Sequence, residues 1–400
     1  MKKKGVPFSV YGTEFLSTKG QPLFETPPDR FDLERWTWTP HDPDGVKYIK
    51  KGARGRLKSW EHAALTNYRP SAHQQNIVLL FHIGLLNHDF IHWFRHCNVK
   101  YFYLSFDQLA SHGNVKIHLG EDRDSSELSI GPARLAMRDI KAVIWERPRT
   151  IFAPMSKVHL NDLLFMRRWW QVLRDLKGLL RPDTIWIPSH PMNGSQDWQN
   201  KIAEYRMAER VGLKVPSTLC TNDPNTAREF IQRHRERVLF REFSLTPFMV
   251  PPKFIHTKGR AVQLKNLKRS PCVFQRFIDK QYDVRAVVLG DEVFACRIDS
   301  QASELAKIDW RVHDDARVKW ELFRLPRAVE RSMCKLLKEL DLLWGSFDLV
   351  KGKDEELYFL EVNRPGACYW LRSFVGLDMA EKIVRFIQPM LDPGVARPSH

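Results

Sequence analysis

Short apolar runs alternate with an amphipathic segment early in the chain. The runs "NIVLLFHIG" (76–84), "KYFYLSF" (100–106) and "KAVIWERPR" (141–149) are mostly apolar, and residues 87–97 between the first two have an amphipathic pattern. Apolar runs of this length predict strands that are buried on both faces. Alternation of such strands with helices predicts an open α/β layer.

Helical periodicity dominates the middle of the chain. Residues 158–180 have apolar positions at helical spacing and stop before Pro182, which predicts a helix that ends there. Residues 196–213 predict a second helix, and residues 214–234 predict a strand, an Asn-Asp-Pro turn and a third helix. Between two further predicted strands, a basic stretch interrupted by proline (244–270) predicts a hairpin or a loop.

Alternating apolar and polar positions in the last third of the chain predict two β-hairpins. The segment "YDVRAVVLGDEVFACRI" (282–298) has the turn dipeptide Gly290-Asp291 at its centre, and "LWGSFDLVKGKDEELYFLEVN" (343–363) forms the second hairpin. One helix is expected between the hairpins at 326–342, and another near the end of the chain at roughly 376–391.

The second hairpin carries polar side chains inside apolar strands. Glu361 and Asn363 are two positions apart, so strand geometry directs them to one face. Asp348 lies on the preceding strand, where hairpin pairing would set it beside Glu361. These residues offer hard oxygen donors that suit Mg²⁺ or Mn²⁺ rather than Zn²⁺, and two adjacent carboxylates repel without a cation between them. We therefore expect a metal site that holds nucleotide phosphates, with solvent-facing polar residues as the alternative.

Composition and charge narrow the classes of protein and partner. With 43% hydrophobic and 28% charged residues, the chain is globular rather than disordered or fibrous. A net charge of +16 favours an acidic partner, such as nucleic acid, a phosphorylated cofactor, an anionic membrane or an acidic peptide. The six cysteines are scattered without a CxxC motif, which predicts reduced thiols and a cytoplasmic location. No apolar run has the length of a membrane span, so no membrane partner is expected.

Several stretches in a particular order resemble a known family. They are "KAVIWERPR" (141–149), "NKIAEYRMAERVGLKVPSTLCTNDP" (200–224), "FQRFIDKQYDVRAVVLGDEVFA" (274–295), "IDWR" (308–311) and "FDLV…YFLEVN" at the metal hairpin. Their order and spacing resemble the ATP-grasp superfamily. Within it they are most similar to the graspetide (microviridin-type) synthetases, which mature ribosomally made peptides. The resemblance runs from roughly residue 76 to residue 391.

The resemblance implies a chain of mixed α/β and α+β class with the ATP-grasp fold. Residues 73–183 would form an amino-terminal open α/β (pre-ATP-grasp) domain with a helical connection, and residues 184–274 a central domain. Residues 275–400 would form a carboxyl-terminal antiparallel-sheet domain that carries the metal site and clasps ATP together with the central domain. Residues 1–72 would be an extension that either packs on the body of the protein or binds a partner.

The resemblance also implies the chemistry of an ATP-dependent ligase. An ATP-grasp enzyme phosphorylates a carboxylate to an acyl phosphate, which an amine, a hydroxyl or a thiol then attacks. Carried over position by position, Asp348, Glu361 and Asn363 would hold two Mg²⁺ ions, with Mn²⁺ as an alternative. The catalytic residues would be Arg285, which contacts phosphate, and Arg311, which steadies the acyl phosphate or the substrate carboxylate.

Further positions that match the family would bind ATP. They are Lys201, Arg241, Asp283 and the hinge residues Gln275, Arg276, Phe277 and Ile278. Structural alternatives remain for the charged residues: Arg285 pairs with Asp283, Arg311 pairs with Asp309, and Lys201 is a solvated helix charge.

The chain departs from the family pattern in three places. Arg241 stands where the family usually has a lysine, and Arg276 stands where an acidic residue is common. After Asn363 the chain continues "RPGACYW" instead of the frequent Pro-Asn-Gly run. The two arginines would change how ATP is held and how the adenine is contacted. The loop after Asn363, which would lie near the acceptor, and the extension at 1–72 favour a substrate different from the Asp/Glu-rich core peptides of the graspetide group.

The leading hypothesis is an ATP- and Mg²⁺-dependent carboxylate ligase that forms an ester or amide on a peptide, in ribosomal peptide maturation. Its partner would be a peptide substrate, with or without a leader segment, and a homodimer is one option for its assembly. One alternative is a ligase of amino acids or small peptides in a natural-product pathway. Another is a non-catalytic nucleotide- or RNA-binding protein. A nucleic acid partner is not expected, because no RNA-binding motif is present and aromatic residues do not interleave with the basic runs.

Overall fold

The computed structural model of the chain divides into two compact units, residues 1–55 and residues 56–400. The structure describes residues 9–10, 13–14, 66–82, 88–105, 109, 113–120, 125–146, 160–189, 201–235, 237–241, 253–254, 264–304, 306–307, 310, 317–364, 368–369 and 371–392. In the first unit the described residues form one antiparallel pair, β1 (Ser9–Val10) with β2 (Thr13–Glu14). The second unit contains the candidate site.

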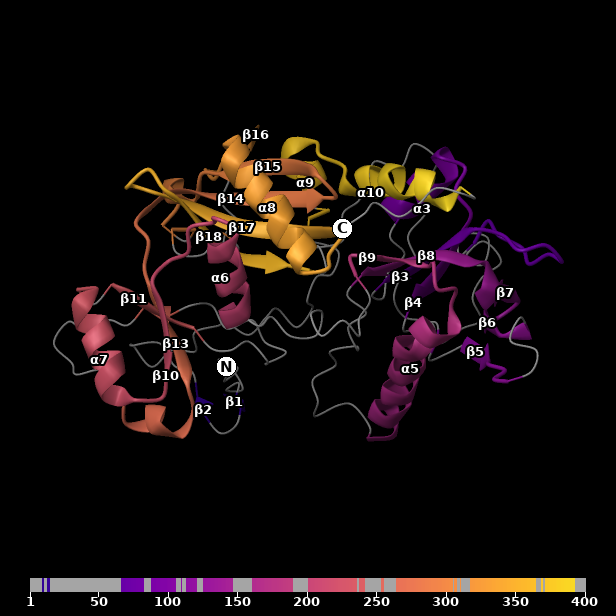
Figure 1. Cartoon of the computed structure of the whole chain (residues 1–400), viewed down its shortest axis with the longest axis horizontal. Helices are drawn as coiled ribbons and strands as arrows, with labels where there is room; N and C mark the ends of the chain where they lie inside the picture. Colours follow the sequence, from indigo (N-terminus) through magenta and orange to yellow (C-terminus); the bar gives the residue numbers. More distant parts are fainter. Residues whose placement is uncertain are drawn as a thin grey trace, which may run out of the picture. The chain divides into compact units, whose positions relative to one another are not determined.

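The predicted open α/β layer is present as a parallel sheet with the strand order β4-β3-β8-β9. Its strands are β3 (Ile77–His82), β4 (Tyr101–Ser105), β8 (Ile140–Glu146) and β9 (Ile185–Ile187). Helices α3 (His88–His96) and α5 (Leu160–Leu179) belong to the connections between these strands, as the sequence predicts (Figure 1). The core positions of β3 are almost fully buried, as expected for a strand covered on both faces.

Two features of this domain were not predicted. A separate antiparallel sheet contains β5 (Gly113–Lys116), β6 (Glu127–Ile130) and β7 (Ala133–Ala136). In addition, Thr66 and Tyr68, which the sequence analysis assigned to the extension, belong to the domain. Thr66 bridges to β4 and Tyr68 is only 3% exposed. The part of the extension before Thr66 lies almost entirely outside the described residues.

The central subdomain is a four-stranded sheet with the order β10-β13-β11-β12. Its strands are β10 (Thr218–Thr221), β11 (Val238–Arg241), β12 (Lys253–Phe254) and β13 (Cys272–Arg276). Helix α7 (Pro224–Arg233) begins at the expected turn, where Asp223 accepts a hydrogen bond from the Thr226 backbone amide (2.8 Å). This side chain caps the helix at its amino terminus. Gln275 and Arg276 complete β13, so they belong to this sheet, although the predicted boundary placed them after it.

The carboxyl-terminal subdomain is a five-stranded antiparallel sheet with the order β16-β15-β14-β17-β18. It contains both predicted hairpins, β14 (Lys280–Leu289) with β15 (Glu292–Ile298), and β17 (Trp344–Gly352) with β18 (Leu357–Asn363). Gly290 forms the first turn with a φ of +57°, a conformation that glycine adopts without steric strain. The edge strand β16 (Trp320–Phe323) was not predicted.

Two helices cover one face of this sheet. Helix α8 (Arg327–Glu339) buries Met333, Leu336 and Leu337, and helix α6 (Lys201–Arg210) buries Tyr205 and Ala208. All of these side chains share one apolar cluster with alternate residues of β14 and β17. The intervening residues of the same strands, which include those proposed as site residues, therefore face the opposite side.

The helix predicted at roughly 376–391 is present as α10 (Met379–Ile387) with a short 3₁₀ turn after it, and a short helix that was not predicted, α9 (Leu371–Val375), precedes it. Asp378 caps α10 and also accepts a hydrogen bond from the Trp93 indole of α3 (2.9 Å). Arg372 forms an ion pair with Asp89 of α3 (2.7 Å). These contacts attach the end of the chain to the α/β domain. Among the described residues, no helix is both long and apolar enough to cross a bilayer.

Candidate functional site

Three residues proposed for the site form one row across adjacent strands. Glu361 of β18 pairs directly with Asp348 of β17, and Asp348 pairs directly with Arg285 of β14. Directly opposed residues of antiparallel strands project their side chains to the same face. The prediction that the hairpin sets Asp348 beside Glu361 is therefore confirmed. Asn363 pairs with Ser346, two residues from Asp348 on the same strand, so it shares this face as well.

An irregularity in β18 decides which side chains point toward the row. The register shifts between Asp348 and Leu349, so that Leu349 pairs with Phe359 and Leu360 is skipped. Because of this β-bulge, Phe359 packs into the apolar cluster under α6 and α8, while Glu361 remains on the opposite face. Bulges often reorient side chains next to functional sites. Strict alternation would have placed Phe359 and Glu361 on the same face.

Asp348 lies at the centre of the row and makes two polar contacts. Its Oδ1 lies 3.0 Å from Nη1 of Arg285, and the two side chains are only 9% and 4% exposed. Its Oδ2 accepts a hydrogen bond from Nδ2 of Asn363 (2.9 Å). A buried carboxylate needs such partners, because an unpaired charge in the interior is strongly unfavourable.

Glu361 is paired with a cation from a different element. Nζ of Lys201, the first residue of α6, lies 2.7 Å from Oε2 of Glu361, and both side chains are about nine-tenths buried. Lys201 is therefore not a solvated helix charge, which was the structural alternative for this residue. The structure brings it to the carboxylate row from 160 positions away in the sequence.

Asp283 is held by a separate buried group. Its Oδ2 lies 2.6 Å from Nζ of Lys280 and accepts a hydrogen bond from the Ser300 hydroxyl, and the Lys280 and Asp283 side chains are each 5% exposed. Arg285 forms its ion pair with Asp348 across the sheet, whereas the carboxylate of Asp283 is bound by Lys280 and Ser300.

Arg285 also contacts an aromatic ring that was not proposed as a site residue. Its guanidinium carbon lies 5.3 Å from the centroid of the Trp310 ring, which is cation–π distance. Trp310 in turn packs edge-on against Trp320 of β16, with 5.5 Å between the ring centroids. Trp310 is the aromatic residue of "IDWR". The motif therefore included this site residue, although only its arginine, Arg311, was proposed as one.

The proposed adenine-binding residues lie at the junction between β13 and β14. Gln275 is buried, and its Nε2 donates to the Tyr205 hydroxyl (2.9 Å) and to Oγ1 of Thr218 (3.0 Å). Ile278 packs with residues of β17 and β18, and the guanidinium of Arg237 lies over the Phe277 ring. Arg276 is exposed. The Gln275 side chain is thus engaged by Tyr205 and Thr218. At the junction, β13 has its backbone groups to offer to a ligand.

Sequence reasoning missed two buried charged residues beside the row. Glu204 of α6 is 1% exposed, and Arg364, directly after β18, is 5% exposed. Burial raises the pKa of Glu204 to about 7, while the positive charges of Arg364 and Lys201 act to lower it and the carboxylate of Glu361 acts to raise it. Burial also lowers the pKa of Arg364. Arg364 is the first residue of "RPGACYW", the segment that departs from the pattern of the resembling family. That departure was the feature of the sequence that could have identified Arg364 as a site residue.

Three comparisons with known proteins place this geometry in context. No protein-family model and no curated protein sequence matches the chain. Many solved structures do match. One is a RiPP-associated ATP-grasp ligase of Chryseobacterium gregarium, in complex with ADP and with a leader and core peptide. It has a TM-score of 0.65 and 22% identity over 80% of this chain and 98% of that one.

Two further matches are of the same kind. The macrocyclase MdnC of Microcystis aeruginosa, bound with precursor peptide MdnA, has a TM-score of 0.64 and 22% identity over 79% of this chain and 99% of that one. The ATP-grasp ligase PsnB, complexed with minimal precursor, Mg and ADP, has a TM-score of 0.63 and 17% identity over 80% of this chain and 100% of that one. The chain has the ATP-grasp fold. The fold expected from the sequence resemblance is thereby confirmed.

Within this ATP-grasp fold, the donor set of the row suits a hard divalent cation. Asp348 and Glu361 are adjacent carboxylates and Asn363 adds an amide, which are groups that Mg²⁺ accepts alongside phosphate and water. The described part of the chain contains no group of three or more His, Cys, Asp or Glu side chains that could hold a metal ion. The row is a smaller donor set, with two carboxylates and one amide.

Two further residues were proposed for the site, Arg311 and Arg241. Arg311 lies outside the described residues, as does its alternative partner Asp309. Arg241 ends β11 in the central sheet, but its side chain is not described. Most of the predicted hairpin or loop at 244–270 is also outside the described residues, apart from β12 and a 3₁₀ segment at Lys265–Arg269.

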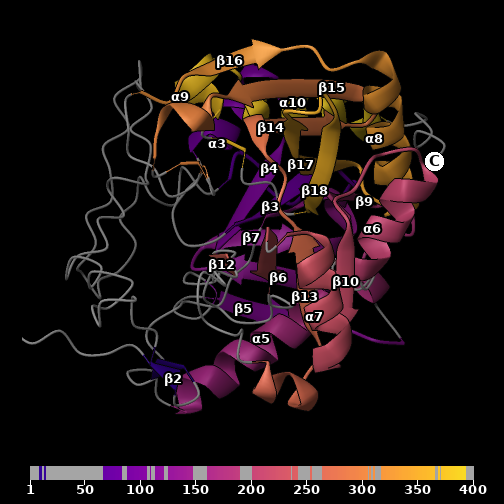
Figure 2. The same cartoon turned by 90° about the vertical axis from the view of Figure 1, so that its left-hand side faces the viewer.

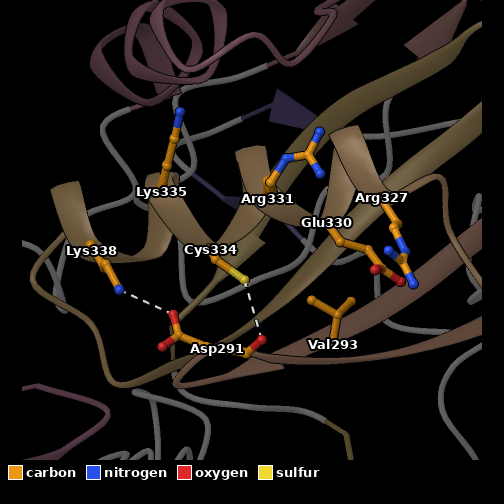
Figure 3. Close-up of a pocket in the computed structure, with 8 residues that line it drawn as sticks. All are labelled: Asp291, Val293, Arg327, Glu330, Arg331, Cys334, Lys335 and Lys338. Atoms are coloured by element: carbon orange, nitrogen blue, oxygen red, sulfur yellow. Dashed lines mark hydrogen bonds and ion pairs between the residues drawn. The ribbon is translucent and has the colours of Figure 1, made fainter. Parts of the chain in front are cut away.

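A surface hollow of about 410 Å³ lies away from the row, along α8 and the turn between β14 and β15 (Figure 3). Arg331 and Lys335 line it, and Lys338 forms an ion pair with Asp291 (3.0 Å). Since α8 packs on the face opposite Asp348, this hollow is separate from the candidate nucleotide site.

Proposed function

We propose that the chain is an ATP- and Mg²⁺-dependent ligase that activates a carboxylate and joins it to an amine or a hydroxyl of a peptide substrate. The observation that carries the proposal is the row of Glu361, Asp348 and Arg285 across three strands of an ATP-grasp sheet. The carboxylates of Glu361 and Asp348 are now paired with the side chains of Lys201 and Arg285. In the proposed function these carboxylates bind metal ions, and the two cationic side chains bind phosphate. Few structural roles would require four buried charges in one place.

In this proposal Asp348, Glu361 and Asn363 hold two Mg²⁺ ions, with Mn²⁺ as a substitute. When bound, such ions neutralise the charge of the phosphates during transfer. The fit rests on the adjacent carboxylates and on the amide of Asn363, which already contacts Asp348.

The protein's own cations orient the nucleotide. The guanidinium of Arg285 presents several donors in one plane, which suits two phosphate oxygens. Lys201 and Arg241 supply further positive charge to the phosphates, and Arg311 acts on the activated carboxylate. The segment from Gln275 to Ile278 borders the adenine, and the buried contacts of Asp283 hold the strand that carries Arg285.

The reaction follows from these roles in two steps. A carboxylate oxygen attacks the γ-phosphorus of ATP, the bond between that phosphorus and the β–γ bridging oxygen breaks, and ADP leaves with that oxygen. The nitrogen or oxygen of the acceptor then attacks the carbonyl carbon and loses its proton, and phosphate leaves. The products are ADP, phosphate and an amide or an ester.

A peptide substrate is supported by two observations. Three solved structures with this fold contain peptide or precursor partners, and the net charge of +16 favours acidic ligands. A leader segment, recognised apart from the reacting residue, belongs to the proposal. The setting would be the maturation of ribosomally made peptides.

Calorimetric titration with ATP and Mg²⁺ tests the nucleotide site. Wild-type protein should bind ATP in a Mg²⁺-dependent manner, and Glu361→Gln should bind it at least tenfold more weakly. The matched control is Glu356→Gln, an exposed residue of the same hairpin that should leave the affinity unchanged. Absence of binding by the wild-type protein, or equal binding by Glu361→Gln, would overturn the proposal.

A further inference from the structure

Helix α6 places two opposite charges beside the metal strand. Lys201 and Glu204 are one helical turn apart on α6 and thus lie on the same side of the helix. Both face β18, since Lys201 reaches Glu361, and Tyr205 packs against Phe359 with 6.3 Å between their rings. Helix α6 contacts this strand, and both views show it beside the sheet that contains β18 (Figures 1 and 2).

Glu204 is an unusual buried group. It is 1% exposed, and neither of its carboxylate oxygens has a hydrogen-bond partner of normal geometry, although the backbone of Val362 in β18 acts on it. A buried carboxylate without such a partner is costly, and natural proteins rarely retain one without a reason. The charges that act on it are those of Arg364, Glu361 and Lys201, so Glu204 lies within electrostatic reach of the Lys201–Glu361 pair.

The ammonium group of Lys201 contacts one of the two neighbouring carboxylates, Glu361, and not Glu204. In the structure it lies 2.7 Å from Glu361, the residue proposed to bind metal. A divalent cation on Glu361 would repel the ammonium at that distance, because like charges in a buried site interact strongly. The long, flexible lysine side chain has three donors that can be redirected, and the carboxylate of Glu204 on the same helix face offers a second acceptor without a side-chain partner.

We propose that Glu204 is a positioning residue that accepts the ammonium of Lys201 when a divalent cation occupies Glu361. This inference rests on the proposed metal site. The lysine then moves between two carboxylates and stays buried and paired in both arrangements. Glu204 thereby lowers the free-energy cost of exchanging the protein cation for the metal ion, without itself touching the metal.

Binding of Mn²⁺ alone, followed by the loss of its free EPR signal, tests this role through a double-mutant cycle. Glu204→Gln should weaken Mn²⁺ binding about threefold to tenfold, because Lys201 loses its second acceptor. Lys201→Met should bind Mn²⁺ at least as tightly as wild type, because the competing cation is gone. In the double variant Glu204→Gln/Lys201→Met, the Glu204 substitution should have no further effect. Glu209→Gln, at an exposed position of the same helix, is the matched control.

The cycle separates this role from a general effect of charge. If Glu204→Gln weakened Mn²⁺ binding equally with and without Lys201, Glu204 would act only through its field and the inference would be overturned. Unchanged binding in Glu204→Gln would also overturn it. If the wild-type protein bound no Mn²⁺, the metal site and the inference would fail together, whereas Mn²⁺ binding with additive effects would leave the proposed ligase intact. Circular dichroism of each variant verifies its fold.

Discussion

Arg285 and Asp348 are direct partners across β14 and β17, and their side chains form a buried ion pair with 3.0 Å between Nη1 and Oδ1. The pair joins the proposed phosphate-binding arginine to a proposed metal ligand. Removal of either charge would deprive the other buried group of its partner across the sheet. The stability of the sheet and the chemistry of the site therefore depend on the same contact.

We expect Asp348→Asn to lower the free energy of unfolding by ~3 kcal/mol, because the buried guanidinium of Arg285 loses the carboxylate that faces it across the sheet. The same variant should lose Mg²⁺-dependent ATP turnover. Urea denaturation and an ADP-release assay measure the two effects. Glu356→Gln, whose side chain is 52% exposed, should change neither. Wild-type stability in Asp348→Asn would show that the pair contributes nothing to folding.

Trp310 should hold the Arg285 guanidinium through its ring face. A cation–π contact at a desolvated position contributes ~1–2 kcal/mol, so Trp310→Ala should weaken ATP·Mg²⁺ binding about fivefold to thirtyfold. Trp310→Phe keeps an aromatic face and should stay within about threefold of wild type. Calorimetry on both variants distinguishes loss of the ring face from a general loss of packing, which would affect the two variants alike.

Glu204 should make the stability of the metal-free protein fall as the pH rises. Its pKa is about 7 in the folded protein against an ordinary value of 4.5, so the folded state binds more protons than the unfolded state between these values. The stabilisation is complete below the ordinary pKa and is lost as the pH rises through 7, with a total of ~3 kcal/mol at most.

Replacement by Gln removes this titration. Denaturation in EDTA from about pH 5 to about pH 8 should therefore show a steeper loss of stability for wild type than for Glu204→Gln. Parallel pH profiles for the two proteins would mean that Glu204 titrates normally.

Gly345 of β17 makes room for the side chains of Val362 and Leu337 in the apolar cluster on the face opposite the row. A Cβ atom there would lie 2.8 Å from Cγ2 of Val362 and 3.3 Å from Leu337, and such overpacking in a core typically costs ~1–3 kcal/mol. Gly345→Ala should lower the denaturation midpoint accordingly. Gly178 of α5 has open space around its Cα, so Gly178→Ala should be neutral or stabilising by ~0.5–1 kcal/mol. If Gly345→Ala and Gly178→Ala had the same effect on stability, the space around Gly345 would not restrict the side chain at this position.

Local patterns in the sequence predicted many of the elements around the site. The alternation in "YFLEVN" and "GSFDLV" predicts strands whose polar residues share a face, and hairpin pairing then brings Asp348 and Glu361 together. Such predictions succeed because side-chain direction in a strand and the register of a short hairpin depend on neighbouring residues. The edge strand β16 and the sheet of β5, β6 and β7 were missed because their strands are only four residues long.

The sequence by itself determined the types of side chain at the site and the face that the carboxylates share. Only the tertiary structure decided their partners. The sequence offered Asp283 as the partner of Arg285, and the strand order adds Asp348, which faces the arginine across the sheet. Lys201 meets Glu361 because α6 packs along β18, although the sequence separates them by 160 positions. Burial and long-range pairing depend on how elements that are distant in the sequence pack together, and local periodicity does not specify that packing.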